Sequence, residues 1–217
     1  MKLTYCILIS NLMLVSLFAQ PKAEETGHYV FPEFTQGIVL LKSGVTEKTV
    51  LNYNSLTEEM VYIDKGTKLA LSDETVAKID TIYIKNRKFV VVGSKFFELI
   101  CHSKFDLFME HKCKLNSVGK PTAYGATSHS TTTSSYTSSP TEGMKYELKL
   151  SDEYQVEPYI VYWIKKTNSS KKFANMRQLK NLYTAKRDLM ETYVNEHVVK
   201  YNDPKTIVQL IEYLESH

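Results

Sequence analysis

The feature that most constrains this fold is a succession of short runs of alternating apolar and polar residues, separated by turn residues. The alternation is cleanest in residues 81–85 and 58–64, which predicts strands with one buried and one solvated face. Turn residues follow at Ser43-Gly44, at 64–66 and at Asn86, where positive φ is tolerated. Several short strands at regular spacing indicate an antiparallel sheet or a barrel-like domain.

A stretch rich in serine and threonine interrupts this pattern. Twelve of the fifteen residues in 127–141 are Ser or Thr, and such a composition buries too little apolar surface to offset the entropy of ordering it. Strand-like runs resume at 144–151 and 157–166, and two strands alone rarely form a stable domain. We therefore expect residues 126–142 to be a long loop within one β-rich region, 36–166. A linker between two domains is the alternative.

The period of the apolar residues changes near Asn175. Leu179, Leu182 and Tyr183 recur at helical spacing, and Asp203-Pro204 is a typical helix start, with a capping residue before proline. These helices, within 174–216, are too few and too short to form a core of their own. We expect two to three C-terminal helices packed on the antiparallel sheet, so the predicted fold class is α+β.

The N-terminus has the order of a secretory signal peptide. Lys2 precedes an apolar run of about 12 residues and the small residue Ala19, and the run is shorter than the ~20 residues that span a bilayer. This predicts a signal peptide at 1–19, cleavage before Gln20 and a single exported domain at 20–217, with no transmembrane span.

The composition of the exported part argues against nucleic-acid binding. Without the signal peptide, Lys and Arg fall from 27 to 26 against 24 Asp and Glu, a net charge of +2. Phosphate binding needs a concentrated basic face, which this balance does not indicate.

Two cysteines remain after cleavage, Cys101 and Cys113. A hairpin with its turn near 102–104 would place Cys113 about 30 Å along the second strand, whereas a disulfide needs Cα atoms within about 7 Å. We expect free thiols, although a sharp bend would allow a bridge. Together with His102 and His111 they form two thiol–imidazole pairs, but their spacing matches no zinc motif, and we predict no metal site.

Four aromatic residues are the candidate binding residues. Tyr154, Tyr159, Tyr162 and Trp163 occur in one strand-like run, and aromatic residues with a polar tip are enriched at binding surfaces. Completion of the core by these side chains is the alternative interpretation.

Signatures of common enzymes do not occur in the sequence. There is no P-loop, GxGxxG, GxSxG or HExxH motif, and so no cofactor is predicted. Glu58 and Glu59 are adjacent in a predicted strand and would point to opposite faces, so they could not act together as a glycosidase pair.

Several segments together resemble an uncharacterised exported protein family of Bacteroidota. They are FTQGIVL, LNYN, KIDTIYIKNRKFVVV, FFELI, GKPTAYGATS and the tail LKNLYTAKRDLMETYVNEHVVKYNDPKTIVQLIEYL. In the tail, Lys186 and Arg187 match the basic pair of the family pattern, and Tyr183 stands where Phe would be usual. The resemblance implies export, one β-rich domain and an envelope location, and it carries over no catalytic residue.

The sequence therefore favours a non-enzymatic binding or accessory module of the periplasm or the outer-membrane periphery. Its expected partner is an envelope protein or a glycan. A secreted hydrolase, carbohydrate-active for instance, with a site assembled from dispersed residues is the alternative. Convergent carboxylates with perturbed pKa values would favour the hydrolase.

Overall fold

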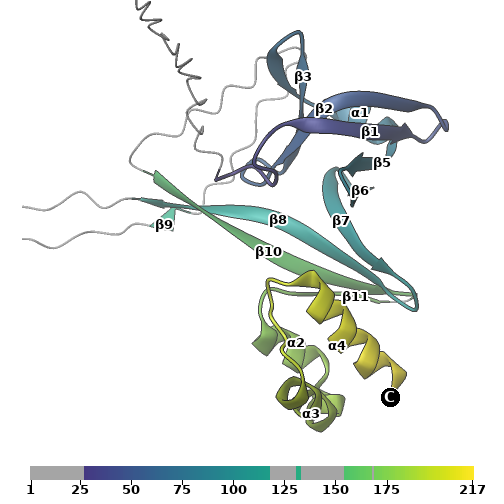
Figure 1. Ribbon diagram of the computed structural model, residues 1–217, viewed down its shortest axis with the longest axis vertical. Coiled ribbons are helices and arrows are strands. Elements are labelled where there is room, and N and C mark those ends of the chain that lie inside the picture. Colours follow the sequence, from purple (N-terminus) through teal and green to yellow (C-terminus); the bar gives the residue numbers. More distant parts are fainter. Residues whose placement is uncertain (1–26, 118–130, 133–153, 168) are drawn as a thin grey trace, which may run out of the picture.

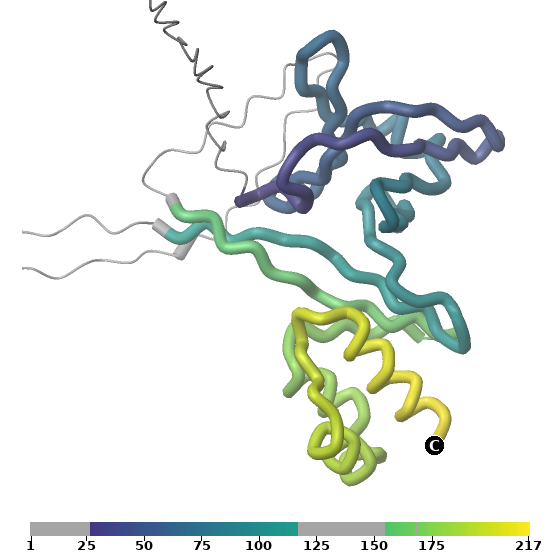
Figure 2. Tube along the Cα trace, in the orientation of Figure 1, coloured from purple at the N-terminus to yellow at the C-terminus, as the bar shows by residue number. Residues whose placement is uncertain are grey.

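In the described part of the chain, eleven strands form one antiparallel sheet, shown as a ribbon in Figure 1 and as a trace in Figure 2. The computed structural model describes residues 27–117, 131–132, 154–167 and 169–217. The strands are β1 (Thr35–Leu41), β2 (Thr46–Asn54), β3 (Glu59–Asp64), β4 (Thr67–Ala70), β5 (Ile79–Ile84), β6 (Arg87–Val92), β7 (Lys95–His102), β8 (Asp106–Ser117), β9 (Thr131–Thr132), β10 (Tyr154–Lys166) and β11 (Ser169–Phe173). Their order is β11-β10-β8-β7-β6-β5-β1-β2-β3-β4, and β9 pairs with β8.

Short turns connect most neighbouring strands, as the sequence indicates. The turn between β5 and β6 has two residues, because Ile84 pairs with Arg87. Lys85 has the positive φ in this turn, 55°, where the sequence pointed to Asn86. Gly44, Gly66 and Gly93 also have positive φ, which glycine adopts at little steric cost.

One face of the sheet, which we call the covered face, is mostly apolar, and it carries the buried carboxylate of Glu98 between its two apolar parts. Cross-strand pairs connect Phe89, Glu98, Met109, Tyr162 and Phe173 in a row from β6 to β11, so these side chains share that face. We call the opposite side the outer face.

The strands β1 to β6 curl so that the covered face encloses an N-terminal core. Its buried members are Phe31, Val39, Leu51, Tyr53, Met60, Val76, Ile79, Ile82, Ile84, Phe89 and Phe96. The short helix α1 (Asp73–Lys78) contributes Val76 and is capped by Ser72, whose side chain accepts a hydrogen bond from the Thr75 amide. At the far side of the curl, the loop between β2 and β3 reaches back to β7 and β8 through Glu58.

Three helices cover the other end of the same face (Figure 1). They are α2 (Met176–Leu182), α3 (Arg187–Glu196) and α4 (Pro204–Ser216), with a 3-10 turn η1 (Thr184–Lys186) before α3. Asn175 and Asp203 cap α2 and α4 through their side chains, and Pro204 opens α4 as predicted. The buried members of this C-terminal core are Phe105, Leu107, Met109, Tyr162, Ile164, Phe173, Leu179, Tyr183, Met190, Ile207, Leu210, Ile211 and Leu214.

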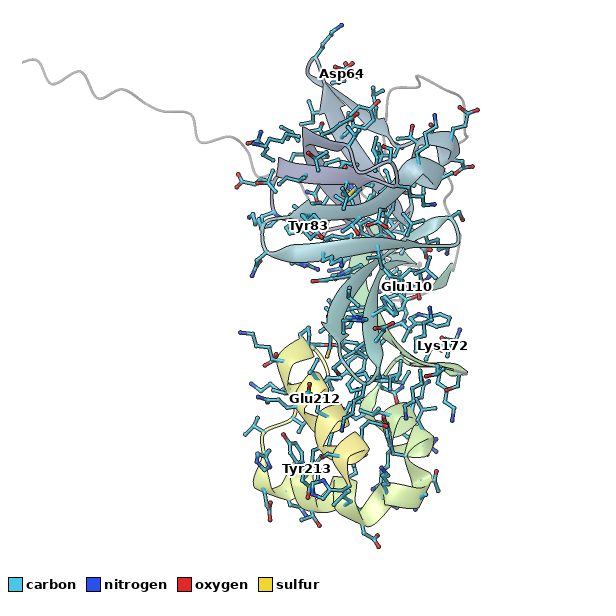
Figure 3. All side chains as sticks on the ribbon, turned by 90° about the vertical axis from the view of Figure 1, so that its right-hand side faces the viewer. Asp64, Tyr83, Glu110, Lys172, Glu212 and Tyr213 are labelled. Atoms are coloured by element: carbon cyan, nitrogen blue, oxygen red, sulfur yellow. The ribbon has the colours of Figure 1, made fainter. Side chains whose placement is uncertain are left out.

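The α+β prediction is confirmed: the chain has an antiparallel, β-rich sheet with helices packed on it towards its C-terminal end. In side view (Figure 3), the curled strands and the helices lie at opposite ends of the molecule. Three of these elements were not predicted from the sequence: the helix α1, the strand β11 and the strand β9, which lies within the predicted loop.

Several sequence predictions lie outside the described residues. These are the signal peptide 1–19, the strand 144–151 and all of the Ser/Thr-rich loop 126–142 except Thr131–Thr132. The latter two residues pair with Leu115 and Asn116 of β8. Among the described residues, none of the helices combines the length and the apolar composition that a bilayer crossing requires.

Candidate functional site

The predicted aromatic residues are divided between the two faces of β10. Tyr162 lies on the covered face, fully buried, and stacks on Phe173 with ring centroids 5.1 Å apart. Its hydroxyl donates to the carbonyl of Tyr201 at 3.1 Å, and burial raises its pKa. Tyr162 thus matches the alternative interpretation, in which the side chain completes the core, because neighbouring strand residues point to opposite faces.

Trp163 lies on the outer face and is partly exposed. Its indole Nε1 donates a hydrogen bond of 3.0 Å to Oε2 of Glu110, a buried carboxylate on β8. The edge of its ring meets Phe97 at a centroid distance of 5.9 Å, and the ammonium of Lys172 lies 5.3 Å from its centroid. These contacts fix the plane of the indole ring at the surface of the sheet.

Tyr159 shares the outer face with Trp163, because the two positions are four apart along one strand. This spacing corresponds to about 13 Å along β10. The ammonium of Lys114 lies 5.0 Å from the ring centroid of Tyr159. Both aromatic side chains are thus accompanied by a lysine, as cation–π pairs. Of Tyr154 the structure gives the backbone pairing, with Ser117, and no side-chain position.

Glu58, on the loop between β2 and β3, binds two lysines next to this surface. Its carboxylate contacts Nζ of Lys95 and of Lys112, and Lys112 also donates to Glu110 at 3.1 Å. Burial opposes ionisation of Glu58, but the hydrogen bonds from the two lysines outweigh it and lower its pKa. Glu58 has φ of 60° and precedes β3, so the prediction that Glu58 and Glu59 both lie in the strand is wrong.

A second charged cluster lies on the covered face, where the two cores meet. Arg87 donates through Nε to Glu98 at 2.7 Å and also contacts the same carboxylate through Nη2. Nε2 of His111 lies 2.8 Å from Glu98 Oε2 and 2.7 Å from Arg87 Nη2. In any one tautomer of the neutral ring, this nitrogen can either donate to Glu98 or accept from Arg87. The Arg87 guanidinium also lies over the rings of Phe31 and Phe89.

Burial lowers the pKa of His111, and the Arg87 charge adds to this effect, whereas the hydrogen bond to the Glu98 carboxylate opposes it. Burial alone would raise the pKa of Glu98, but the hydrogen bonds from His111 and Arg87 dominate and lower it. A neutral imidazole beside a paired carboxylate and guanidinium is a satisfied polar cluster at the seam between two cores.

These carboxylates do not have the properties of a glycosidase pair. A general acid needs a raised pKa, whereas Glu58 and Glu98 have lowered values. A cavity of about 60 Å³ lies elsewhere, between β10, β11 and α2, whereas sites for small molecules measure about 300 to 1,000 Å³. Its lining residues are Ile164, Lys166, Ser169, Lys171, Leu182 and Tyr183.

The cysteines and histidines near the β7–β8 hairpin have separate partners. Cys101 pairs with Leu107 across the hairpin, while Cys113 lies farther along β8 with its Sγ 3.1 Å from Ser55 Oγ, and both are free thiols. His102 contacts Asp106 at 2.5 Å. Within the described ranges, no three His, Cys, Asp or Glu side chains form a group that could hold a metal ion.

Sequence reasoning missed Glu110, Lys114 and Lys172 as neighbours of the aromatic residues. Each lies on a strand next to β10, and its place depends on the register between the strands. For β8 and β10, this register joins residues that are 37 to 59 positions apart in the sequence. Alternation along KFDLFMEHK could have assigned Glu110 to the face opposite Met109, but it could not have paired Glu110 with Trp163.

No protein-family model, no curated protein and no solved structure matches this chain. The resemblance to an exported family of Bacteroidota accordingly stays a prediction, and a function has to be argued from the residues themselves.

Proposed function

We propose that the protein is a non-enzymatic binding module of the cell envelope, exported to the periplasm or the outer-membrane periphery, and that its outer face binds an acidic glycan. The observation that carries this proposal is the pairing of each outer-face aromatic residue on β10 with a lysine. Trp163 and Tyr159 offer rings on which the C–H face of a sugar can pack. Lys172 and Lys114 hold ammonium groups over those rings, and their flexible side chains can shift to meet carboxylate or sulfate substituents of a sugar that packs there.

The hydrogen bond from Trp163 to Glu110 supports this proposal further. A ring that is already oriented loses less conformational freedom when a ligand packs on it. An acidic glycan is favoured over a neutral one because of the two lysines. An envelope protein is the competing partner, and the experiment below separates the two.

Trp163 is the single tryptophan of the chain, so its intrinsic fluorescence reports directly on the site. We expect polygalacturonate to change this fluorescence saturably and neutral dextran to leave it unchanged. In affinity measurements, Trp163→Ala should weaken binding by about tenfold or more, as expected for a central aromatic contact. Tyr213→Ala, which removes a partly exposed aromatic residue from the helical end, is the matched control and should bind normally.

Binding that survives Trp163→Ala, or equal binding of polygalacturonate and dextran, would contradict the site. If no saccharide binds and the protein instead captures one envelope protein, and if Trp163→Ala abolishes that capture, the partner is a protein. Export is tested separately: the periplasmic or outer-membrane fraction should contain a chain that begins at Gln20. Retention of residues 1–19 in the cytoplasmic fraction would contradict export.

A further inference from the structure

A row of side chains crosses the outer face from one end of the sheet to the other. The pairing registers connect one residue of each strand, from β11 to β2, into one continuous line. Its members, in order, are Lys172, Trp163, Phe108, Leu99, Lys88, Tyr83, Ile38 and Lys48. Figure 3 labels two of them, Lys172 and Tyr83. Directly paired residues share a face, so the eight side chains project from the same side of the sheet.

All eight members of this row are at least partly exposed. Tyr83 and Ile38, a direct cross-strand pair, are 38% and 40% exposed, which is unusual for large apolar side chains on a sheet that buries its other face. Neighbouring strands lie about 4.8 Å apart, so the seven steps of the row span about 34 Å.

The charged members of the row are lysines, at both ends and near the middle. Two carboxylates flank it on β8, Asp106 and Glu110, and both have partners of their own. Asp106 contacts His102, and Glu110 accepts from Lys112 and Trp163. The row therefore combines a line of aromatic and aliphatic side chains with an excess of positive charge.

We infer that this row is an extended subsite series for one acidic polysaccharide chain, which lies across the strands and contacts Lys172, Lys88 and Lys48 in turn. This inference rests on the proposed function and extends it from the Trp163 end to the whole outer face. Sugar rings would pack on Trp163 and Tyr83, and their anionic substituents would meet the three lysines.

The shape of the sheet favours a flexible chain over a lipid bilayer. The strands β1 to β6 curl around the N-terminal core, so the outer face is the convex side of that curl (Figure 1). A flat membrane would touch only part of a convex row, whereas a polymer can follow it. A peptide that extends a sheet pairs at an edge strand, and the row lies across the face, where the backbone groups of the strands are already paired.

The test uses oligogalacturonates of graded length, titrated into the purified protein and followed by Trp163 fluorescence and calorimetry. We expect the affinity to rise with length until the ligand spans about 34 Å and then to level off. Lys48→Gln should weaken binding of the longest ligands by about twofold to fivefold and leave the shortest unchanged. Lys172→Gln should weaken the binding of short and long ligands alike.

Lys205→Gln, an exposed lysine of α4 on the helical side, is the matched control and should have no effect at any length. These are exposed lysines, and circular dichroism of each variant checks that the fold is intact. Affinity that is independent of length, with no effect of Lys48→Gln, would overturn the row while leaving the proposed function in place. Failure of all acidic saccharides to bind would overturn both.

Two further probes test the nature of the ligand. Vesicles with anionic lipids and a single-stranded oligonucleotide of about 34 Å should both bind more weakly than the longest oligogalacturonate. If the vesicles bind more strongly than the oligogalacturonate, and if Lys48→Gln and Lys172→Gln weaken that binding, the row would be assigned to a membrane surface and the inference overturned. The same result with the oligonucleotide would assign it to general polyanion binding, with the same consequence.

Discussion

The two ends of the sheet cover the same apolar face in different ways. At the N-terminal end, β1 to β6 curl until the face encloses Leu51, Phe89 and the rest of the N-terminal core. At the C-terminal end, the face stays open and α2, α3 and α4 lie on it, with Leu210 and Leu214 of α4 fully buried. The first end is closed by the strands themselves, whereas the second needs a separate layer of helices.

This difference shows where the sheet has to accommodate charge. Glu98 pairs with Phe89 of the N-terminal core on one side and with Met109 of the C-terminal core on the other. At this seam neither the curled strands nor the helices complete an apolar surface, and Arg87 and His111 satisfy the buried carboxylate. Within the described ranges no helix packs on the outer face, which carries the exposed aromatic residues and lysines of the proposed site.

The largest effects are expected from large-to-small substitutions in the two cores. Phe89→Ala should lower the free energy of unfolding by about 3–5 kcal/mol and Leu210→Ala by about 2–5 kcal/mol, because both side chains are fully buried. Because one sheet runs through both cores, each variant should shift a single unfolding transition. Trp163 fluorescence and helical circular dichroism, followed in urea, should give coincident curves. Separate transitions in Leu210→Ala would show that the helical end unfolds independently.

The seam between the cores should be the next most sensitive position. Glu98→Gln keeps the shape of the side chain but removes the charge that pairs with Arg87 and His111, and it should cost about 2–3 kcal/mol. Urea unfolding at pH 7 measures this loss. Glu157→Gln, on an exposed carboxylate of β10 that accepts from Asn116, is the control and should cost less than about 1 kcal/mol. Equal effects of the two substitutions would mean that the seam cluster contributes no more than a surface contact.

The sequence predicted the elements of this comparison better than their arrangement. Alternation in residues 81–85 and the Asp203-Pro204 start of a helix are local signals. The strand β5 overlaps the first segment, and α4 begins at Pro204. The strand β11 was missed because four of its five residues are exposed, and Phe173 alone is buried. Its place at the sheet edge depends on pairing with β10, which the local sequence SSKKF does not show.

The candidate site was predicted only in part, and for a physical reason. Alternation along 159–163 is enough to separate Tyr162 from Tyr159 and Trp163, because adjacent strand residues face opposite sides. Sequence composition could not show which side the helices would cover. The row from Lys172 to Lys48 depends on seven registers between strands, and none of these is a local property of the chain.

The seam should also make the fold sensitive to acid. The folded-state pKa of His111 is lowered, so stability should begin to fall as the pH drops below about 6.5, its value in the unfolded chain. The pKa values of Glu98 and Glu58 are lowered as well, so the stability they contribute above about pH 4.5 should be lost below it. Each group contributes a slope of at most about 1.4 kcal/mol per pH unit.

The free energy of unfolding, measured in urea from pH 8 to pH 4, tests this prediction. His111→Gln should remove the decline between about pH 6.5 and 5 and preserve the steeper decline below 4.5. If the stability of this variant still falls between pH 6.5 and 5 as in the unmodified protein, another titrating group causes the decline.

The smallest effect concerns the contact that holds the N-terminal curl against β7 and β8. Glu58→Asn removes the ion pairs with Lys95 and Lys112, while asparagine tolerates the φ of 60° at this position. We expect a loss of about 1 kcal/mol, because the lysines are partly exposed and solvent screens the pairs. Lys85→Asn is the matched control, since Lys85 has φ of 55° on an exposed turn, and it should be neutral or stabilising by up to about 0.5 kcal/mol. The difference between the two variants isolates the ion pairs from the backbone effect, and it should shrink in 1 M salt. If both variants have the same stability at low salt, closure of the curl depends on the apolar contacts of the N-terminal core alone. Both ends of the sheet would then be held by apolar packing, and the ion pairs of Glu58 would not distinguish them.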